Sequence, residues 1–226
     1  MIQTSTCGPD LNAVNQAYTK SAHGYAVTGV AAVSCRHAFV RPKGVVDLQK
    51  GERYSVLRLI LFPHSLTNVF RYCNIDYAVA STLADDVNAG IMDVVLTYNI
   101  GCQWNKNLSR RLSSSPLMPS VDIDSLNLFR VAVPKFHIIG HGAQCQAEFN
   151  LAYMDGVGMT HGEGVETIWS HSTSLATWSR ENGPSARHLI LDDHWARWNW
   201  RKCIGLRKPS NLILYTTQLT STKAPN

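Results

Sequence analysis

A short apolar run at residues 92–97 constrains the fold of this chain more than any other feature. Val94, Val95 and Leu96 form its centre, and the polar residue Asn99 follows shortly after it. A short and nearly continuous run of this kind suits a strand that is buried on both faces of a sheet. We therefore expect a central strand here, with Asn99 just beyond its carboxyl end.

Other segments predict a sheet that is covered by helices. Further predicted strands lie at residues 25–34 and 128–133, and further predicted helices lie at residues 11–20, 83–88, 104–112 and 162–177. Strand, loop, strand and helix in this order indicate an α/β fold.

Size, charge and hydropathy narrow the class of protein. The chain has 226 residues, which fits one domain of the usual range of about 100–250 residues. Its net charge of +5 would favour DNA or RNA as a partner, but this excess is modest for a dedicated nucleic-acid binder. The chain has neither a secretory signal pattern at its start nor an apolar run of about 20 residues, so we expect a soluble, intracellular protein.

Histidine and cysteine residues form one candidate metal site. His137, His141 and Cys145 are spaced i, i+4 and i+8, which on one helix would align three ligands for Zn²⁺. Pro134 makes a strand-to-helix junction equally consistent, and then only His141 and Cys145 share a face.

Other residues could complete such a zinc site. Cys35 and His37 form a second candidate pair, and Cys73 could join either group. The alternative is that these side chains are packed in the core without a metal ion.

A basic segment is the candidate nucleic-acid contact. Lys106, Arg110 and Arg111 lie on the predicted helix at residues 104–112. The alternative is an ordinary solvated helix face.

Four collinear blocks of rare residues carry a family resemblance, and together they span most of residues 6–202. The blocks contain Cys35-Arg36-His37-Ala38-Phe39-Val40-Arg41-Pro42 with Gly51-Glu52-Arg53; Tyr98-Asn99-Ile100-Gly101-Cys102-Gln103-Trp104; Val133-Pro134-Lys135-Phe136-His137; and Gly162-Glu163-Gly164 with Leu191-Asp192-Asp193-His194 and Trp198-Asn199-Trp200-Arg201-Lys202. On these residues the chain resembles the Kyakuja/Dileera/Zisupton (KDZ) family of DDE transposases.

The resemblance implies a ribonuclease H/integrase-like mixed sheet with flanking helices. It also implies DNA as the partner, a nuclear location, and three carboxylates that hold two Mg²⁺ ions for DNA strand cleavage and transfer. We expect this fold to be incomplete here, because the first family carboxylate would lie upstream of Met1.

Two further departures concern the remaining carboxylates. Asn99 occupies the position of the second carboxylate, so only Glu163 matches the family's metal ligands. His161 stands where an Asp usually precedes the glycine before Glu163. Asp93 could be proposed as a substitute, although it lies near the other end of the predicted strand. Without the resemblance, Glu163 would be read as a solvated helix-start residue.

Residues 54–71 interrupt the family pattern. The residues at the two ends of this segment can be encoded by splice-site sequences, so we interpret the segment as a translated intron. We interpret residues 1–203 as a partial catalytic domain that contains it. A genuine surface insertion is the alternative. Residues 204–226 also depart from the family pattern and predict a poorly packed tail.

These features lead to three functional hypotheses. The first is a transposase fragment without strand-transfer activity, and the second is a DNA-binding or interaction module that retains the fold. The third is an unrelated hydrolase that uses Glu163 with His161 or His188, although no nucleophile motif supports it.

Overall fold

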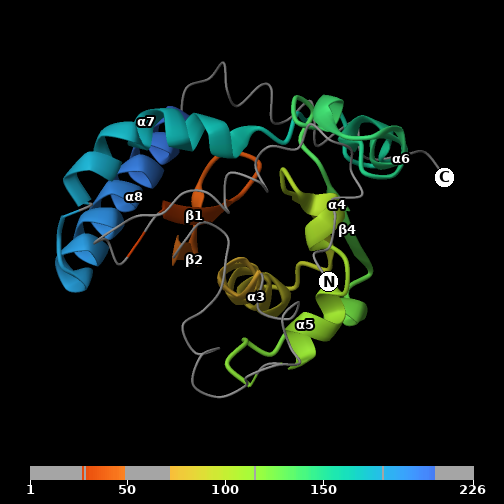
Figure 1. Ribbon diagram of the computed structural model, residues 1–226, viewed down its shortest axis with the longest axis horizontal. Coiled ribbons are helices and arrows are strands. Elements are labelled where there is room, and N and C mark those ends of the chain that lie inside the picture. Colours follow the sequence, from red (N-terminus) through yellow and green to blue (C-terminus); the bar gives the residue numbers. More distant parts are fainter. Residues whose placement is uncertain (1–26, 28, 49–71, 115, 180, 207–226) are drawn as a thin grey trace.

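The computed structural model of the chain describes residues 27, 29–48, 72–114, 116–179 and 181–206 (Figure 1). The strands are β1 (Gly29–Ser34), β2 (Val40–Leu48), β3 (Asp93–Thr97) and β4 (Leu128–Ala132). The helices are α3 (Cys73–Asn88), α4 (Gly101–Trp104), α5 (Leu108–Ser114), α6 (Ala143–Glu148), α7 (Gly164–Ser179) and α8 (Pro184–Leu206), with 3-10 turns η1 (Ile123–Ser125), η2 (Ile138–Gly140) and η3 (Leu151–Tyr153). The described part of the chain is α/β, as the sequence predicted.

The described strands form two separate pairs. Strands β1 and β2 are an antiparallel hairpin, whereas β3 and β4 are parallel. Thr97 pairs with Ala132 at the ends of the parallel strands. Because parallel strands end at the same edge, the segments that follow Thr97 and Ala132 emerge side by side.

A cavity of about 1200 Å³ lies between the two pairs. Each residue at positions 30–34 of β1 and 93–97 of β3 lines this cavity, and α3 contributes side chains such as Val79 and Leu83. Neighbouring side chains of a strand point to opposite faces, so a cavity lined by each residue in turn follows the edge of the strand. The edges of β1 and β3 that have no strand partner among the described residues therefore border one shared space.

The described hydrophobic core has two parts. The first surrounds Trp104 between α3, α4, α5 and β4, and the second lies between the hairpin and helices α7 and α8. In the second part Ile168, Leu191 and Trp195 are buried against Val40 of β2. Figure 1 shows α7 and α8 together on the side of the hairpin. No helix in the described ranges has the length and hydropathy needed to span a bilayer.

A buried ion pair joins the helices of the first core. Asp76, in the first turn of α3, is fully buried and accepts hydrogen bonds from Arg111 Nε at 2.7 Å and Trp104 Nε1 at 2.8 Å. Arg111 Nη2 also donates to the Trp104 carbonyl at 2.7 Å, and the guanidinium lies 5.1 Å from the centre of the Tyr72 ring. Burial raises the pKa of Asp76, while Arg111 and Trp104 oppose this shift. The network links α3, α4 and α5.

Strand β3 confirms the predicted strand, but the prediction that it is buried on both faces is wrong. Val94, Val95 and Leu96 are half-buried, and Asp93 is exposed. The reason is that β3 pairs only with β4 among the described residues, while its other edge borders the cavity.

The prediction of one continuous basic helix at residues 104–112 is also wrong. Helix α4 ends at Trp104 and α5 begins at Leu108. Between them Asn107 has a φ of 58°, a left-handed conformation that cannot continue an α-helix.

Other boundaries differ less from the prediction. The helix expected around residues 83–88 begins earlier, at Cys73, and the helix expected at residues 162–177 is α7. Strand β2 and helix α8 were not predicted; Pro42 and Gly44 weaken the strand pattern of β2.

Several predictions fall outside the described residues. These are the helix at residues 11–20, most of residues 25–28, the proposed insertion at residues 54–71 and the tail beyond residue 206. Residues 204–206, which begin the predicted tail, belong to α8.

Replacing Arg111 with alanine should lower the free energy of unfolding by about 3–5 kcal/mol, because Asp76 would be left buried and unpaired. The exposed neighbour Arg110 is the matched control. Arg110→Ala should change the free energy of unfolding by less than about 0.5 kcal/mol. Urea unfolding of the two variants measures the difference. Equal effects would mean that the ion pair does not support the core.

Candidate functional site

The turn after β3 places Asn99 close to the end of β4. Tyr98 donates its backbone N–H to the Ala132 carbonyl at 3.0 Å, which continues the pairing beyond Thr97. A Cβ atom at Gly101 would lie 2.9 Å from both the Ala132 oxygen and a Val131 methyl group. Only glycine permits this approach, so the start of α4 packs directly on β4.

Glu163 lies beside the same strand ends. The carbonyl of the preceding residue, Gly162, is 3.4 Å from the Thr97 hydroxyl group, and the His161 carbonyl accepts the Lys135 N–H at 3.0 Å. Gly162 has a φ of 71°, so the chain turns sharply here before α7. Asn99 and Glu163 both line the cavity described above.

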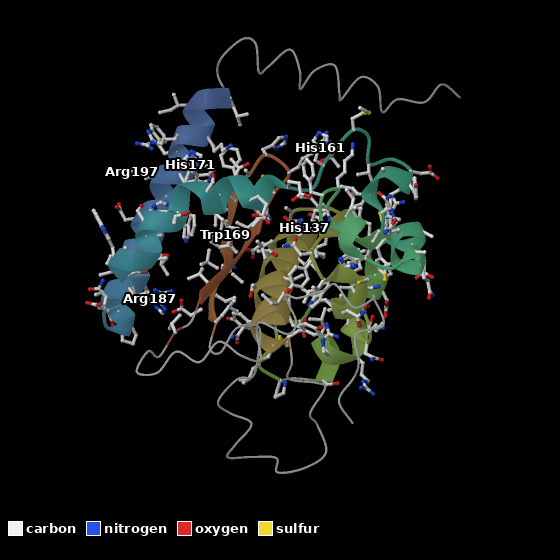
Figure 2. All side chains as sticks on the ribbon, turned by 45° about the horizontal axis from the view of Figure 1, so that its top comes forward. His137, His161, Trp169, His171, Arg187 and Arg197 are labelled. Carbon is white, nitrogen blue, oxygen red and sulfur yellow. The ribbon has the colours of Figure 1, made fainter. Side chains whose placement is uncertain are left out.

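Two neighbours engage the Glu163 carboxylate. Its Oε1 accepts the Phe136 N–H at 2.8 Å, and its Oε2 lies 3.3 Å from His137 Nδ1. His137 Nε2 is 3.7 Å from Glu166 Oε1. His137 and His161 lie near the start of α7 (Figure 2). Ligand atoms of His137, Glu163 and Glu166 lie within 4.8 Å of one another, so this group could hold a metal ion, although exposed acidic groups are common without one.

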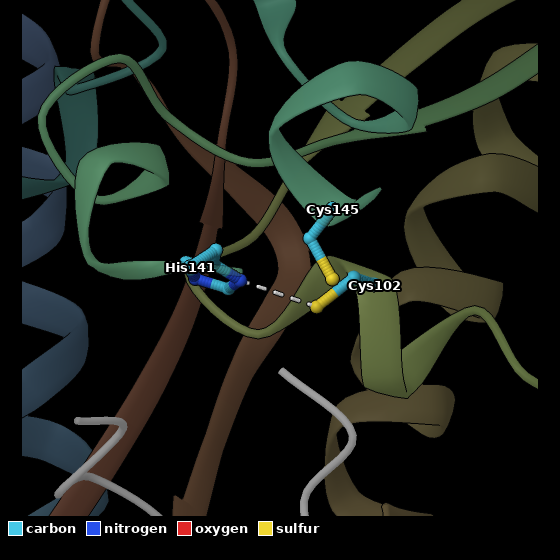
Figure 3. A group of neighbouring side chains, drawn as sticks. All are labelled: Cys102, His141 and Cys145. Carbon is cyan, nitrogen blue, oxygen red and sulfur yellow. Dashed lines mark hydrogen bonds between the residues drawn. The ribbon is translucent and has the colours of Figure 1, made fainter. Parts of the chain in front are cut away.

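Cys102, His141 and Cys145 form a second group, which could hold a metal ion (Figure 3). Their ligand atoms lie within 4.8 Å of one another, and Cys102 Sγ is 3.4 Å from His141 Nδ1. Cys102 and His141 are buried, and Cys145 is half-buried. Two sulfur atoms and one imidazole nitrogen are ligand types that suit Zn²⁺.

The hydrogen bonds of His141 prepare it to bind a metal. Its Nε2 lies 3.1 Å from the Asn99 carbonyl, which can only accept, so Nε2 carries the proton and Nδ1 faces Cys102 with a lone pair. Burial, the largest influence, lowers the pKa of His141, which favours the neutral imidazole that can bind a metal ion. Metal-binding histidines usually donate their second N–H to a carbonyl or carboxylate in this way.

The group differs from the predicted set of zinc ligands. The single-helix alternative is wrong, because α6 begins at Ala143, after His141. The structure nevertheless brings His141 and Cys145 together and adds Cys102 from a distant segment. His137 instead faces Glu163.

The remaining candidate ligands lie in other parts of the fold. Cys35 and His37 are in the turn between β1 and β2, where burial and Arg36 lower the pKa of His37. Cys73 begins α3, and burial and Asp76 raise the pKa of its thiol. Neither Cys35, His37 nor Cys73 belongs to a metal-competent group among the described residues.

The predicted nucleic-acid residues separate into two kinds. Lys106 and Arg110 are exposed, but Arg111 is only 4% exposed and pairs with Asp76. Arg111 shares the inward side of α5 with Leu108 and Leu112. The prediction that Arg111 contacts nucleic acid is therefore wrong.

The alternative partners of Glu163 lie in three different segments of the chain. His188 lies 3.4 Å from Asp47 and is part of α8, while Asp93 begins β3, at the opposite end from Asn99. His161 is exposed and contacts Lys135 through its backbone carbonyl.

Gly162→Ala should destabilise the chain more than Gly158→Ala. Both glycines have positive φ, 71° and 65°, so each substitution costs about 1–2 kcal/mol of backbone strain. The new Cβ at position 162 would also lie 3.0 Å from a Thr97 methyl group, whereas the space around Gly158 is open. This crowding should lower the free energy of unfolding, measured with urea, by about a further 1–3 kcal/mol. Equal losses would show that the approach of residue 162 to β3 is not tight.

Comparison with known families accounts for most of the chain. The family model of the Kyakuja-Dileera-Zisupton transposase matches residues 1–199. No curated protein and no solved structure matches the chain. The matched residues include β3, Asn99, Glu163 and the candidate metal ligands Cys102, His141 and Cys145. The chain therefore belongs to the Kyakuja-Dileera-Zisupton transposase family.

Proposed function

We propose that this chain is a transposase-derived catalytic domain that does not perform metal-dependent cleavage or joining of DNA. The supporting observation is that a neutral residue, Asn99, follows β3 at the edge where Glu163 lines the same cavity. In this proposal residues 1–203 form a ribonuclease H/integrase-like domain, interrupted by a translated intron at residues 54–71.

The argument for inactivity is electrostatic. Two divalent ions held about 3.5–4 Å apart need several anionic oxygen ligands to offset their charge. Glu163 supplies one negative charge, and its oxygens already face Phe136 N–H and His137. Asn99 can offer a carbonyl oxygen but no charge, and the second carboxylate of the group, Glu166, lies 3.7 Å from His137 Nε2. In this proposal the two carboxylates near His137 do not suffice for two Mg²⁺ ions.

The purified chain should show no Mg²⁺- or Mn²⁺-dependent nicking or joining of a labelled DNA duplex. Asn99→Asp should strengthen binding of one Mn²⁺ ion, measured by calorimetry, because it restores a charge beside Glu163, but it should not restore strand transfer. Reproducible nicking by the unmodified chain that Glu163→Gln abolishes would overturn the proposal.

We further infer that the metal ion of Cys102, His141 and Cys145 is Zn²⁺. Thiolate and imidazole ligands favour zinc over Mg²⁺, which prefers oxygen. Three protein ligands leave one position of a tetrahedral ion for water or another ligand. This centre is chemically separate from the carboxylate chemistry of Glu163.

The chain purified with zinc in the medium should contain about one Zn²⁺ per molecule by mass spectrometry of metals. Cys102→Ser and Cys145→Ser should each remove most of it, because each deletes a thiolate ligand. Cys203→Ser is the control, since Cys203 is exposed on α8 and should not affect the zinc content. A chain free of zinc, or one that keeps it in both ligand variants, would refute this assignment.

A DNA-binding module without catalysis, located in the nucleus, is the second candidate. Membership of a transposase family and the exposure of Lys106 and Arg110 favour it. Duplex binding that weakens with salt, and that falls further in Lys106→Ala and Arg110→Ala, would distinguish this module from an inert remnant.

A further inference from the structure

We propose that the metal centre of Cys102, His141 and Cys145 is a clamp that holds the Asn99 backbone and the Glu163 carboxylate in their places beside the cavity. This inference rests on the Zn²⁺ proposed above. In this proposal Glu163 is not a metal ligand. Its contact with the Phe136 N–H is coupled to the metal centre through the backbone between Phe136 and His141.

The first arm of the clamp runs through Asn99. Cys102 follows Asn99 by three residues, across the first turn into α4. His141 Nε2 donates to the Asn99 carbonyl at 3.1 Å, while Nδ1 of the same ring faces Cys102. A metal ion bound to both Cys102 and His141 therefore closes a small ring that includes the Asn99 carbonyl.

The second arm runs along the segment from Pro134 to His141. Backbone hydrogen bonds fold this segment into consecutive turns, from Ile138 N–H to the Pro134 carbonyl and from His141 N–H to the Ile138 carbonyl, each at 3.0 Å. At its start Lys135 N–H contacts the His161 carbonyl and Phe136 N–H contacts Glu163. A shift of His141 is thus transmitted through a short, hydrogen-bonded path to Glu163.

A metal ion would add a bond between Cys102 and His141 to the hydrogen bond by which His141 already holds the Asn99 carbonyl. Among the contacts of the described residues, Cys102 and His141 meet through a thiol–imidazole contact of 3.4 Å, and a thiol is a poor hydrogen-bond donor. Cys145 reaches the group from α6, so an ion that bound all three residues would join α4, the Pro134–His141 segment and α6.

Reciprocity makes the clamp measurable without an activity assay. If the bound metal ion stabilises the contact between Phe136 and Glu163, then loss of that contact must weaken metal binding by the same factor. The probe is Zn²⁺ itself, titrated into the metal-free full chain in competition with a chromophoric chelator.

Glu163→Ala should weaken Zn²⁺ binding by about 5–150-fold, the range usual for coupling between two separate sites. Glu163→Gln keeps an oxygen acceptor for Phe136 N–H and should retain most of the affinity, which separates the hydrogen bond from the charge. Glu148→Gln is the control for charge, because Glu148 ends α6 and contacts Gln144.

The outcomes distinguish the clamp from the zinc site itself. Circular dichroism of each variant identifies any that fails to fold, and Glu163→Leu, which also lacks an acceptor for Phe136 N–H, replaces Glu163→Ala if that variant does not fold. Weaker Zn²⁺ binding by the variant without an acceptor than by both Glu163→Gln and Glu148→Gln supports the hydrogen-bonded path, and an equal loss in Glu163→Gln overturns it. If all folded variants bind Zn²⁺ as the unmodified chain does, the clamp is refuted and the zinc site stands. If the unmodified chain binds no Zn²⁺, both inferences fail.

Discussion

The buried ion pair of Asp76 and Arg111 is the interaction on which the arrangement of the first core depends. Burying two charges is costly, and here the cost is offset because both carboxylate oxygens and most of the guanidinium group have partners. The pair ties α4 and α5 to the first turn of α3. Since α4 carries Cys102 and begins just after Asn99, the same ion pair fixes one side of the candidate metal centre.

The two strand pairs explain why polar residues gather beside the cavity. A parallel pair brings the segments after β3 and β4 to one edge, and the chain returns to this edge at Gly162 before α7. Three segments that are far apart in the sequence therefore meet there. They carry Asn99, the Pro134–His141 segment and Glu163. Because the outer edge of β3 has no strand partner in the described part of the chain, the cavity reaches along it.

Two kinds of metal chemistry meet at this edge. Glu163 offers hard oxygen ligands, whereas Cys102, His141 and Cys145 offer sulfur and nitrogen. A zinc ion bound by Cys102, His141 and Cys145 would not be bound by the Glu163 carboxylate, which instead lies 3.3 Å from His137. In our proposal the family's strand-transfer chemistry is lost while the scaffold around it is kept.

Local sequence determined the features that depend on neighbouring residues. The apolar run of β3, the start of α7 and the pairing of His141 with Cys145 follow from hydrophobic periodicity and short spacing, which act within a few residues. Only the tertiary structure decided the partner of Cys102, which is 39 residues from His141, and the burial of Arg111, which is 35 residues from Asp76. A cysteine or an arginine has the same local pattern whether it is buried or exposed. Its role depends on which distant segment packs against it, and that is set by the folding of the whole core.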